Sequence, residues 1–79
     1  MLEIHPAARK QGVADTDIEH AVSHPMSIDH RDDHTRLYLS AARNAELLEV
    51  ATIIRVDRSE IAIHAMKLRQ KYRRLLPGE

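Results

Sequence analysis

Three stretches between residues 36 and 66 alternate apolar and polar side chains, and only short turns separate them. They are 36–40, 47–56 and 60–66, and the second is rich in β-branched residues. A period of two is typical of strands, and short turns join antiparallel neighbours. With a further short strand expected at 26–28, the pattern predicts an antiparallel β-meander of three or four strands.

Helices are expected on both sides of this meander. Pro6 suits the start of a short helix over 7–11 that Gly12 ends, and a second helix should begin with a cap at Asp15 or Thr16 and run to about His24. A third helix is expected over 67–76, and a short strand over 2–5. The predicted fold is therefore α+β: two N-terminal helices, the meander and a basic C-terminal helix.

The alternation also sorts the strand residues onto two faces of the sheet. A core face should carry Leu37, Leu39, Leu48, Val50, Ile54, Val56, Ile61 and Ile63. The opposite face should be wet, and it should carry Arg36, Tyr38, Ser40, Glu49, Arg55, Glu60 and His64. A register slip of one residue would exchange the two faces.

The length of 79 residues suits one domain, 1–79, which buries only about 60–65% of its unfolded surface. Because cysteine is absent, no disulfide or thiolate zinc site can stabilise it, which favours a partner chain or an oligomer. No stretch approaches the roughly 18 apolar residues of a membrane helix, and the first residues do not resemble a signal peptide. A cytoplasmic location is therefore expected.

The net charge of zero conceals an uneven distribution. Residues 1–34 carry seven acidic and three basic residues, whereas residues 58–79 carry six basic and two acidic ones. The acidic part suits a basic partner, and the basic part suits an anion such as a nucleic-acid backbone.

The basic segment 67–76 combines five cations with one aromatic ring. The cations are Lys67, Arg69, Lys71, Arg73 and Arg74. They can neutralise phosphates, and Tyr72 can stack on a base or hydrogen-bond to a phosphate. The alternative is a solvated helix whose cations interact with its C-terminal dipole.

His64 is the main candidate for proton transfer, because histidine exchanges protons near neutral pH. Cleavage of RNA without a metal needs a base for the 2′-hydroxyl, an acid for the leaving 5′-oxygen and cations for the charge on phosphorus. Glu49 and Tyr38 are further proton-transfer candidates, and Arg36, Arg55, Arg69 and Lys71 are candidates for the charge. The alternative is that His64 is a hydrogen-bonded structural histidine.

Two histidine pairs raise the question of a metal site. His20 and His24 are four residues apart on a predicted helix, and His30 and His34 flank two aspartates. No zinc spacing is complete, and the turn 29–33 lacks the glycine and glutamate of a calcium-binding loop. We therefore expect surface histidines, a solvated turn, and neither a metal nor another cofactor.

The segments RKQGVADTDIEHAVSHP, LLEV, IIRVD and IHAMKLRQKY, in this order, resemble the BrnT-like branch of the RelE/ParE toxin superfamily. The resemblance covers nearly the whole chain. It implies an RNA-cleaving, translation-blocking toxin, an antitoxin encoded beside it, and a sheet flanked by helices (a RelE-like fold). Three departures stand out. Gln11 replaces a common histidine, the turn 42–45 lacks glycine, and 64–66 reads His-Ala-Met instead of Ser-Ala-Arg, so Arg69 would substitute for the missing arginine.

Together, residue chemistry and resemblance predict a metal-independent endoribonuclease toxin. The predicted catalytic residues are His64, Arg69, Lys71, Tyr72, Glu49 and Arg55. The predicted RNA-binding residues are Arg36, Tyr38, Lys10, Lys67, Arg73 and Arg74. The expected partners are a cognate antitoxin and RNA, including ribosome-bound mRNA. The alternatives are a non-catalytic domain that binds nucleic acid or a partner protein, and a subunit that only completes a partner's fold.

Overall fold

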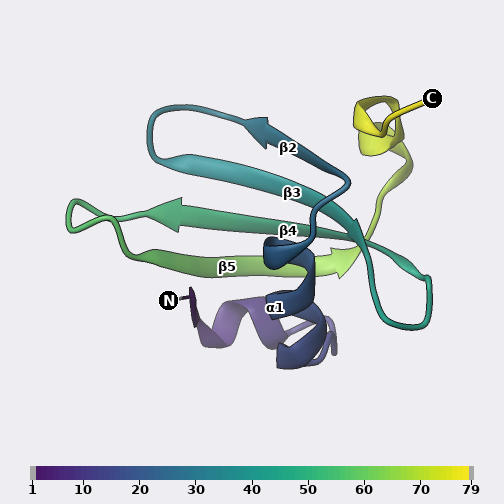
Figure 1. Cartoon of the computed structure of the whole chain (residues 1–79). Helices are drawn as coiled ribbons and strands as arrows, with labels where there is room; N and C mark the ends of the chain where they lie inside the picture. Colours follow the sequence, from purple (N-terminus) through teal and green to yellow (C-terminus); the bar gives the residue numbers. More distant parts are fainter. Residues whose placement is uncertain (1, 79) are drawn as a thin grey trace.

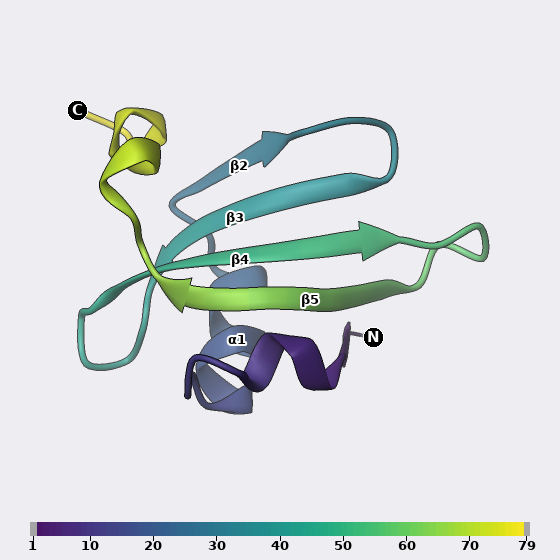
Figure 2. The same cartoon turned by 180° about the vertical axis from the view of Figure 1, so that it is seen from behind.

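A computed structural model of the chain describes residues 2–78, and five strands form its single mixed sheet. The elements are β1 (Leu2–Ile4), η1 (Pro6–Arg9, a 3-10 turn), α1 (Asp15–Ser23), β2 (Ser27–His30), β3 (Thr35–Ala41), β4 (Leu47–Ile54), β5 (Glu60–Lys67) and η2 (Gln70–Leu75, a second 3-10 segment). The strand order is β1-β5-β4-β3-β2 (Figures 1 and 2). β1 runs parallel to β5, and the other neighbours are antiparallel.

The predicted fold is wrong, because the structure is mostly sheet with one α-helix among residues 2–78. The four-stranded meander is present, but β1 adds a parallel strand beside β5. The expected first helix is only the 3-10 turn η1, in which Nδ1 of His5 accepts the backbone N–H of Ala7. The expected helix over 15–24 is α1, but Ala14 stands at its N-cap, and no side chain caps it.

The predicted C-terminal helix over 67–76 is also wrong. Lys67 still belongs to β5, and Arg69 is extended, with φ −80° and ψ 148°. The backbone N–H of Leu68 donates to the carbonyl of Leu47, and that of Arg69 donates to the carboxylate of Glu49. These tertiary hydrogen bonds override helix propensity, so the chain turns only over η2.

One sheet face, here called the helix face, is covered by α1 and η1 (Figures 1 and 2). Ile18 and Ala21 of α1 and Ala8 of η1 are buried there. They pack against the buried strand residues Tyr38, Val50, Ala62 and Ala65. This cluster forms the main core.

The opposite face, here called the η2 face, is covered at one end by the C-terminal segment. Leu37 and Leu39 are buried there with Leu76, and Leu68, Tyr72 and Leu75 pack against them. The predicted faces are therefore wrong for β3, where Tyr38 and Ser40 are buried and Leu37 and Leu39 belong to the second cluster. At β3, one face of the sheet is covered by α1 and the other by the C-terminal segment, so Leu37, Tyr38 and Leu39 are all buried.

A β-bulge breaks the predicted alternation in β5. Ala51 pairs with His64 and Thr52 pairs with Ala62, so Ile63 is the extra residue. Ala62 and Ala65 therefore both pack in the core of the helix face, although they are three residues apart. The same bulge sets His64 opposite Ala51, which packs in the cluster on the η2 face. Within residues 2–78, no helix has the length and apolar character needed to span a membrane.

Candidate functional site

The carboxylate of Glu49 is the centre of a polar cluster on the η2 face. Glu49 lies in β4, and its side chain is fully buried. It accepts hydrogen bonds from Arg69 through the backbone N–H at 2.9 Å, Nε at 3.0 Å and Nη2 at 2.7 Å. Nε2 of His64 lies 3.1 Å from the same carboxylate. Two side chains and one backbone amide thus satisfy Glu49 and attach the C-terminal segment to the sheet.

The charge of Glu49 is stabilised against the cost of its burial. Burial alone would raise the pKa of Glu49, because a buried carboxylate loses its hydration. The hydrogen bonds from Arg69 and His64, together with the charge of Arg69, outweigh the burial, so the pKa of Glu49 lies below its ordinary value. Glu49 is therefore an anion at neutral pH, and Arg69 is its counter-ion.

His64 is oriented by this anion. Its side chain is 34% exposed, and the carboxylate beside Nε2 requires a proton on that nitrogen. In the neutral ring, the lone pair then resides on Nδ1. A ligand beside His64 would therefore meet a proton acceptor whose tautomer is set by Glu49.

The ring of Tyr72 lies among three cations. The guanidinium carbons of Arg31 and Arg69 lie 5.0 Å and 5.2 Å from the ring centroid, and Nζ of Lys71 lies 5.0 Å from it. All three distances are within the range of cation–π attraction. Arg31 also forms an ion pair with Asp29 at 3.3 Å. The ring therefore gathers positive charge from two segments that are distant in sequence.

These groups border a cavity of about 350 Å³. Its lining includes Arg31, Glu49, His64, Arg69 and Tyr72 from four parts of the chain. The volume falls within the roughly 300–1,000 Å³ that is usual for small-ligand sites. A cavity that combines cations, an oriented imidazole and a phenol suits a phosphate-bearing ligand.

Four of the six residues predicted to be catalytic, Glu49, His64, Arg69 and Tyr72, line this one cavity. Lys71 contacts the ring of Tyr72. Arg55 lies elsewhere, beyond β4 at the turn into β5, where its Nη1 donates to Glu3 at 3.0 Å.

The residues predicted to bind RNA are dispersed. Arg36 lines the cavity, but its Nη1 lies 3.4 Å from the hydroxyl of Tyr38. Tyr38 is only 3% exposed and donates to Glu60, so its ring has no surface on which a base could stack. Lys67 forms a long ion pair with Glu46, at 3.9 Å. Lys10 and Arg74 are exposed, and Arg73 is half-buried.

Arg31 and Thr35 are lining residues that sequence reasoning missed. Arg31 belongs to the charged turn 29–33, which was expected to be a solvated turn. Its mixed charges gave no sign that this arginine reaches Tyr72, 41 positions further along the chain. The only available signal was a cation within a turn between two expected strands.

The histidine pairs do not assemble a metal site. The rings of His20 and His24 stack with centroids 4.8 Å apart and an interplanar angle of 21°. Among residues 2–78, no three His, Cys, Asp or Glu side chains gather in a way that could hold a metal ion.

Comparison of the chain with protein-family models, with curated proteins and with solved structures finds no significant match.

Proposed function

We propose that this chain is a metal-independent endoribonuclease that acts in the cytoplasm as the toxin of a toxin–antitoxin pair and blocks translation. The observation that carries the enzymatic part is His64, oriented by the buried anion Glu49, in a cavity that also holds Arg31, Arg69 and Tyr72. The resemblance to BrnT-like toxins supports the biological role. The proposal rests on the chemistry of this cavity and does not require a RelE-like fold.

In the proposed reaction, Nδ1 of His64 takes the proton of a ribose 2′-hydroxyl. The resulting alkoxide attacks the neighbouring phosphorus, and the bond from phosphorus to the 5′-oxygen of the next nucleotide breaks. The phenol of Tyr72 donates a proton to that leaving oxygen. The products are a 2′,3′-cyclic phosphate and a 5′-hydroxyl. Proton transfer through water from the His64 imidazolium to the Tyr72 phenolate then restores both side chains.

The cations around Tyr72 have two roles in this scheme. Arg31 and Lys71 neutralise the negative charge that grows on the phosphate oxygens in the transition state. Arg69 is already paired with Glu49, so its main contribution is to hold that carboxylate, and with it His64, in place. Arg69 is therefore a positioning residue here.

A second candidate function is phosphate binding without cleavage. The carboxylate of Glu49 contacts both Arg69 and Nε2 of His64. A purely structural ion-pair network has the same arrangement, and this favours the second function. Such a protein would bind RNA in a salt-sensitive manner and leave it intact.

Expression in a bacterial host from a tightly repressed promoter tests the proposed function. We expect growth arrest and new RNA fragments after induction, both relieved by co-expression of the neighbouring open reading frame as the antitoxin. The key variant is His64→Gln, because the glutamine amide can still donate to Glu49 but cannot exchange protons. His34→Gln is the matched control, since His34 is exposed and lies outside the lining of the cavity.

Arrest by the wild type and by His34→Gln, with normal growth of cells that make folded His64→Gln, would support the enzyme. Normal growth and intact RNA with folded wild-type protein would exclude the toxin role in that host. Equal arrest by His64→Gln would remove His64 from the mechanism.

A further inference from the structure

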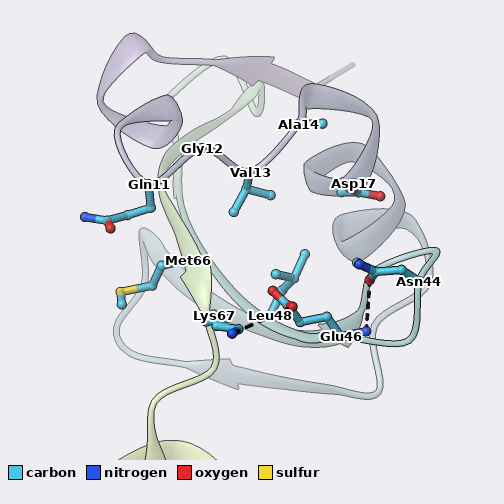
Figure 3. Close-up of a pocket in the computed structure, with 11 residues that line it drawn as sticks. Gln11, Gly12, Val13, Ala14, Asp17, Asn44, Glu46, Leu48, Met66 and Lys67 are labelled. Atoms are coloured by element: carbon cyan, nitrogen blue, oxygen red, sulfur yellow. Dashed lines mark hydrogen bonds and ion pairs between the residues drawn. The ribbon is translucent and has the colours of Figure 1, made fainter.

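A second and larger cavity, of about 550 Å³, lies where β5 leaves the sheet. Its lining comes from residues 11–14, Asp17 of α1, the hairpin between β3 and β4 with Leu48 of β4, and the end of β5 (Figure 3). Leu48 and Lys67 are paired across β4 and β5 at this end. Neither the cavity nor most of its lining has a part in the proposed cleavage reaction.

The walls of this cavity combine an apolar surface with hydrogen-bonding groups. The side chains of Val13 and Leu48 point into it from opposite sides (Figure 3). The polar residues of the lining include Gln11, Asn44, Asp17 and Glu46. This combination suits a flat ligand with apolar faces and a polar edge.

Each of the two carboxylates in the lining has a cationic partner, which favours a neutral ligand over a cation. Asp17 is paired with Arg43 at 3.3 Å, and Glu46 is paired with Lys67 at 3.9 Å. The carboxylates still provide hydrogen-bond acceptors, because each has two oxygens with several lone pairs. The ligand should therefore be neutral and should present N–H donors.

We propose that this cavity binds a base of the RNA substrate, guanine in preference to uracil, and that Glu46 accepts hydrogen bonds from its edge. Guanine presents two adjacent donors, N1–H and the 2-amino group, which match the two oxygens of a carboxylate. Uracil presents one N–H between two carbonyls, which a carboxylate repels. Bases of single-stranded RNA are commonly recognised along this edge. The inference rests on the proposed function for its substrate class.

The larger cavity lies on the helix-face side of the sheet, where Val13 packs, and the smaller one lies on the η2 face. The chain passes from one to the other where β5 ends. Lys67 lines the larger cavity, here called the base cavity. Arg69, two residues further on, lines the smaller cavity beside Tyr72, here called the phosphate cavity. The segment between them is extended, so it spans about 7 Å. An RNA strand that passes around this end of β5 can thus place a base in one cavity and a phosphate in the other. The ammonium of Lys67 is 74% exposed at the rim, where it can contact the connecting backbone.

The test is a nuclear magnetic resonance titration of the whole ¹⁵N-labelled chain. Guanosine monophosphate, uridine monophosphate and inorganic phosphate are added in separate experiments. We expect the guanosine nucleotide to shift the backbone amides of Gly12 and Asn44 with an affinity at least about tenfold higher than that of the uridine nucleotide. Inorganic phosphate should shift the amides of 69–72 and leave Gly12 unmoved.

The variant Glu46→Gln should reduce the guanosine affinity to the uridine level and leave the phosphate titration unchanged. Glu19→Gln, an exposed acidic position of α1 outside the lining, is the matched control and should behave as the wild type. Equal affinities for the two nucleotides, guanosine shifts confined to 69–72, or full guanosine binding by Glu46→Gln would overturn the inference. If only inorganic phosphate fails to shift the amides of 69–72, the result counts against the proposed function but not against guanine binding in the base cavity.

Discussion

The guanidinium of Arg69 and the carboxylate of Glu49 form a two-pronged ion pair, through Nε at 3.0 Å and Nη2 at 2.7 Å, and the backbone N–H of Arg69 adds a third hydrogen bond at 2.9 Å. This one relationship ends β5, directs η2 onto the sheet and positions His64. The fold and the proposed chemistry therefore depend on the same contact.

Removing either partner of this pair should destabilise the protein. Arg69→Ala should lower the free energy of unfolding by about 3–5 kcal/mol, because it leaves the buried carboxylate of Glu49 without its counter-ion. Glu49→Ala should cost less, because the side chain of Arg69 is 41% exposed and can be hydrated. The double variant Glu49→Ala with Arg69→Ala should cost less than the sum of the two single changes, since no unpaired charge remains. Urea denaturation measures all three.

The matched control for the pair is Glu46→Ala. The side chain of Glu46 forms a long, exposed ion pair with Lys67, so its loss should cost less than about 1 kcal/mol. Additive costs in the Glu49/Arg69 cycle would show that the two residues are not energetically coupled.

Stability should fall in acid through Glu49. Its pKa is lowered in the folded protein, so its contribution is fully present above the unfolded value of about 4.3 and is lost as the pH falls through the folded value. The difference in unfolding free energy between the wild type and Glu49→Gln should therefore shrink as the pH falls below about 4.3. The other carboxylates are common to both proteins, so their contributions cancel in this difference. A difference that stays constant with pH would show that Glu49 does not cause the loss of stability in acid.

The variant Tyr38→Phe tests whether the hydroxyl of Tyr38 stabilises the fold or, as predicted from the sequence, contributes to RNA binding. The hydroxyl of Tyr38 donates to Glu60, and Thr52 donates to the same carboxylate at 2.5 Å. Loss of the hydroxyl should cost about 1 kcal/mol of stability and leave RNA affinity unchanged. Thermal unfolding and a filter-binding assay measure the two effects. Reduced RNA affinity in folded Tyr38→Phe would show that the hydroxyl of Tyr38 takes part in RNA binding.

The cations around Tyr72 should determine the salt dependence of RNA binding. Arg31→Gln and Lys71→Gln should each weaken binding and reduce the slope of log affinity against log salt by about 0.7 for single-stranded RNA. Arg58→Gln is the control, because Arg58 is exposed in the turn between β4 and β5 and lies outside both cavities. An equal loss in the control would indicate that charge acts nonspecifically over the whole surface.

Much of the sheet could be predicted from the sequence, because the alternation in 36–40, 47–56 and 60–66 has a local cause. The faces could not be predicted as easily. The segment Leu37–Tyr38–Leu39 is apolar on both sides, so its burial depends on what covers each face. The bulge at Ile63 also changes the phase of β5, and no glycine marks it.

The C-terminal segment shows where local propensity fails. Residues 67–76 have the composition of a helix, yet Arg69 is held extended by its bonds to Glu49, twenty positions earlier in the chain. The residue types of Glu49, His64 and Arg69 made them candidates, because ionisable groups often carry chemistry. Their contact across strands β4 and β5 depends on register, which the sequence leaves open.

The most direct test of the account is a cleavage assay with purified protein and end-labelled single-stranded RNA in the presence of a metal chelator. The account predicts that wild-type protein and His34→Gln release fragments that end in 2′,3′-cyclic phosphate, and that folded His64→Gln cleaves at least about a hundredfold more slowly. Equal cleavage by His64→Gln, or intact RNA with folded wild-type protein that binds it, would contradict the claim that His64 acts as the base of a ribonuclease.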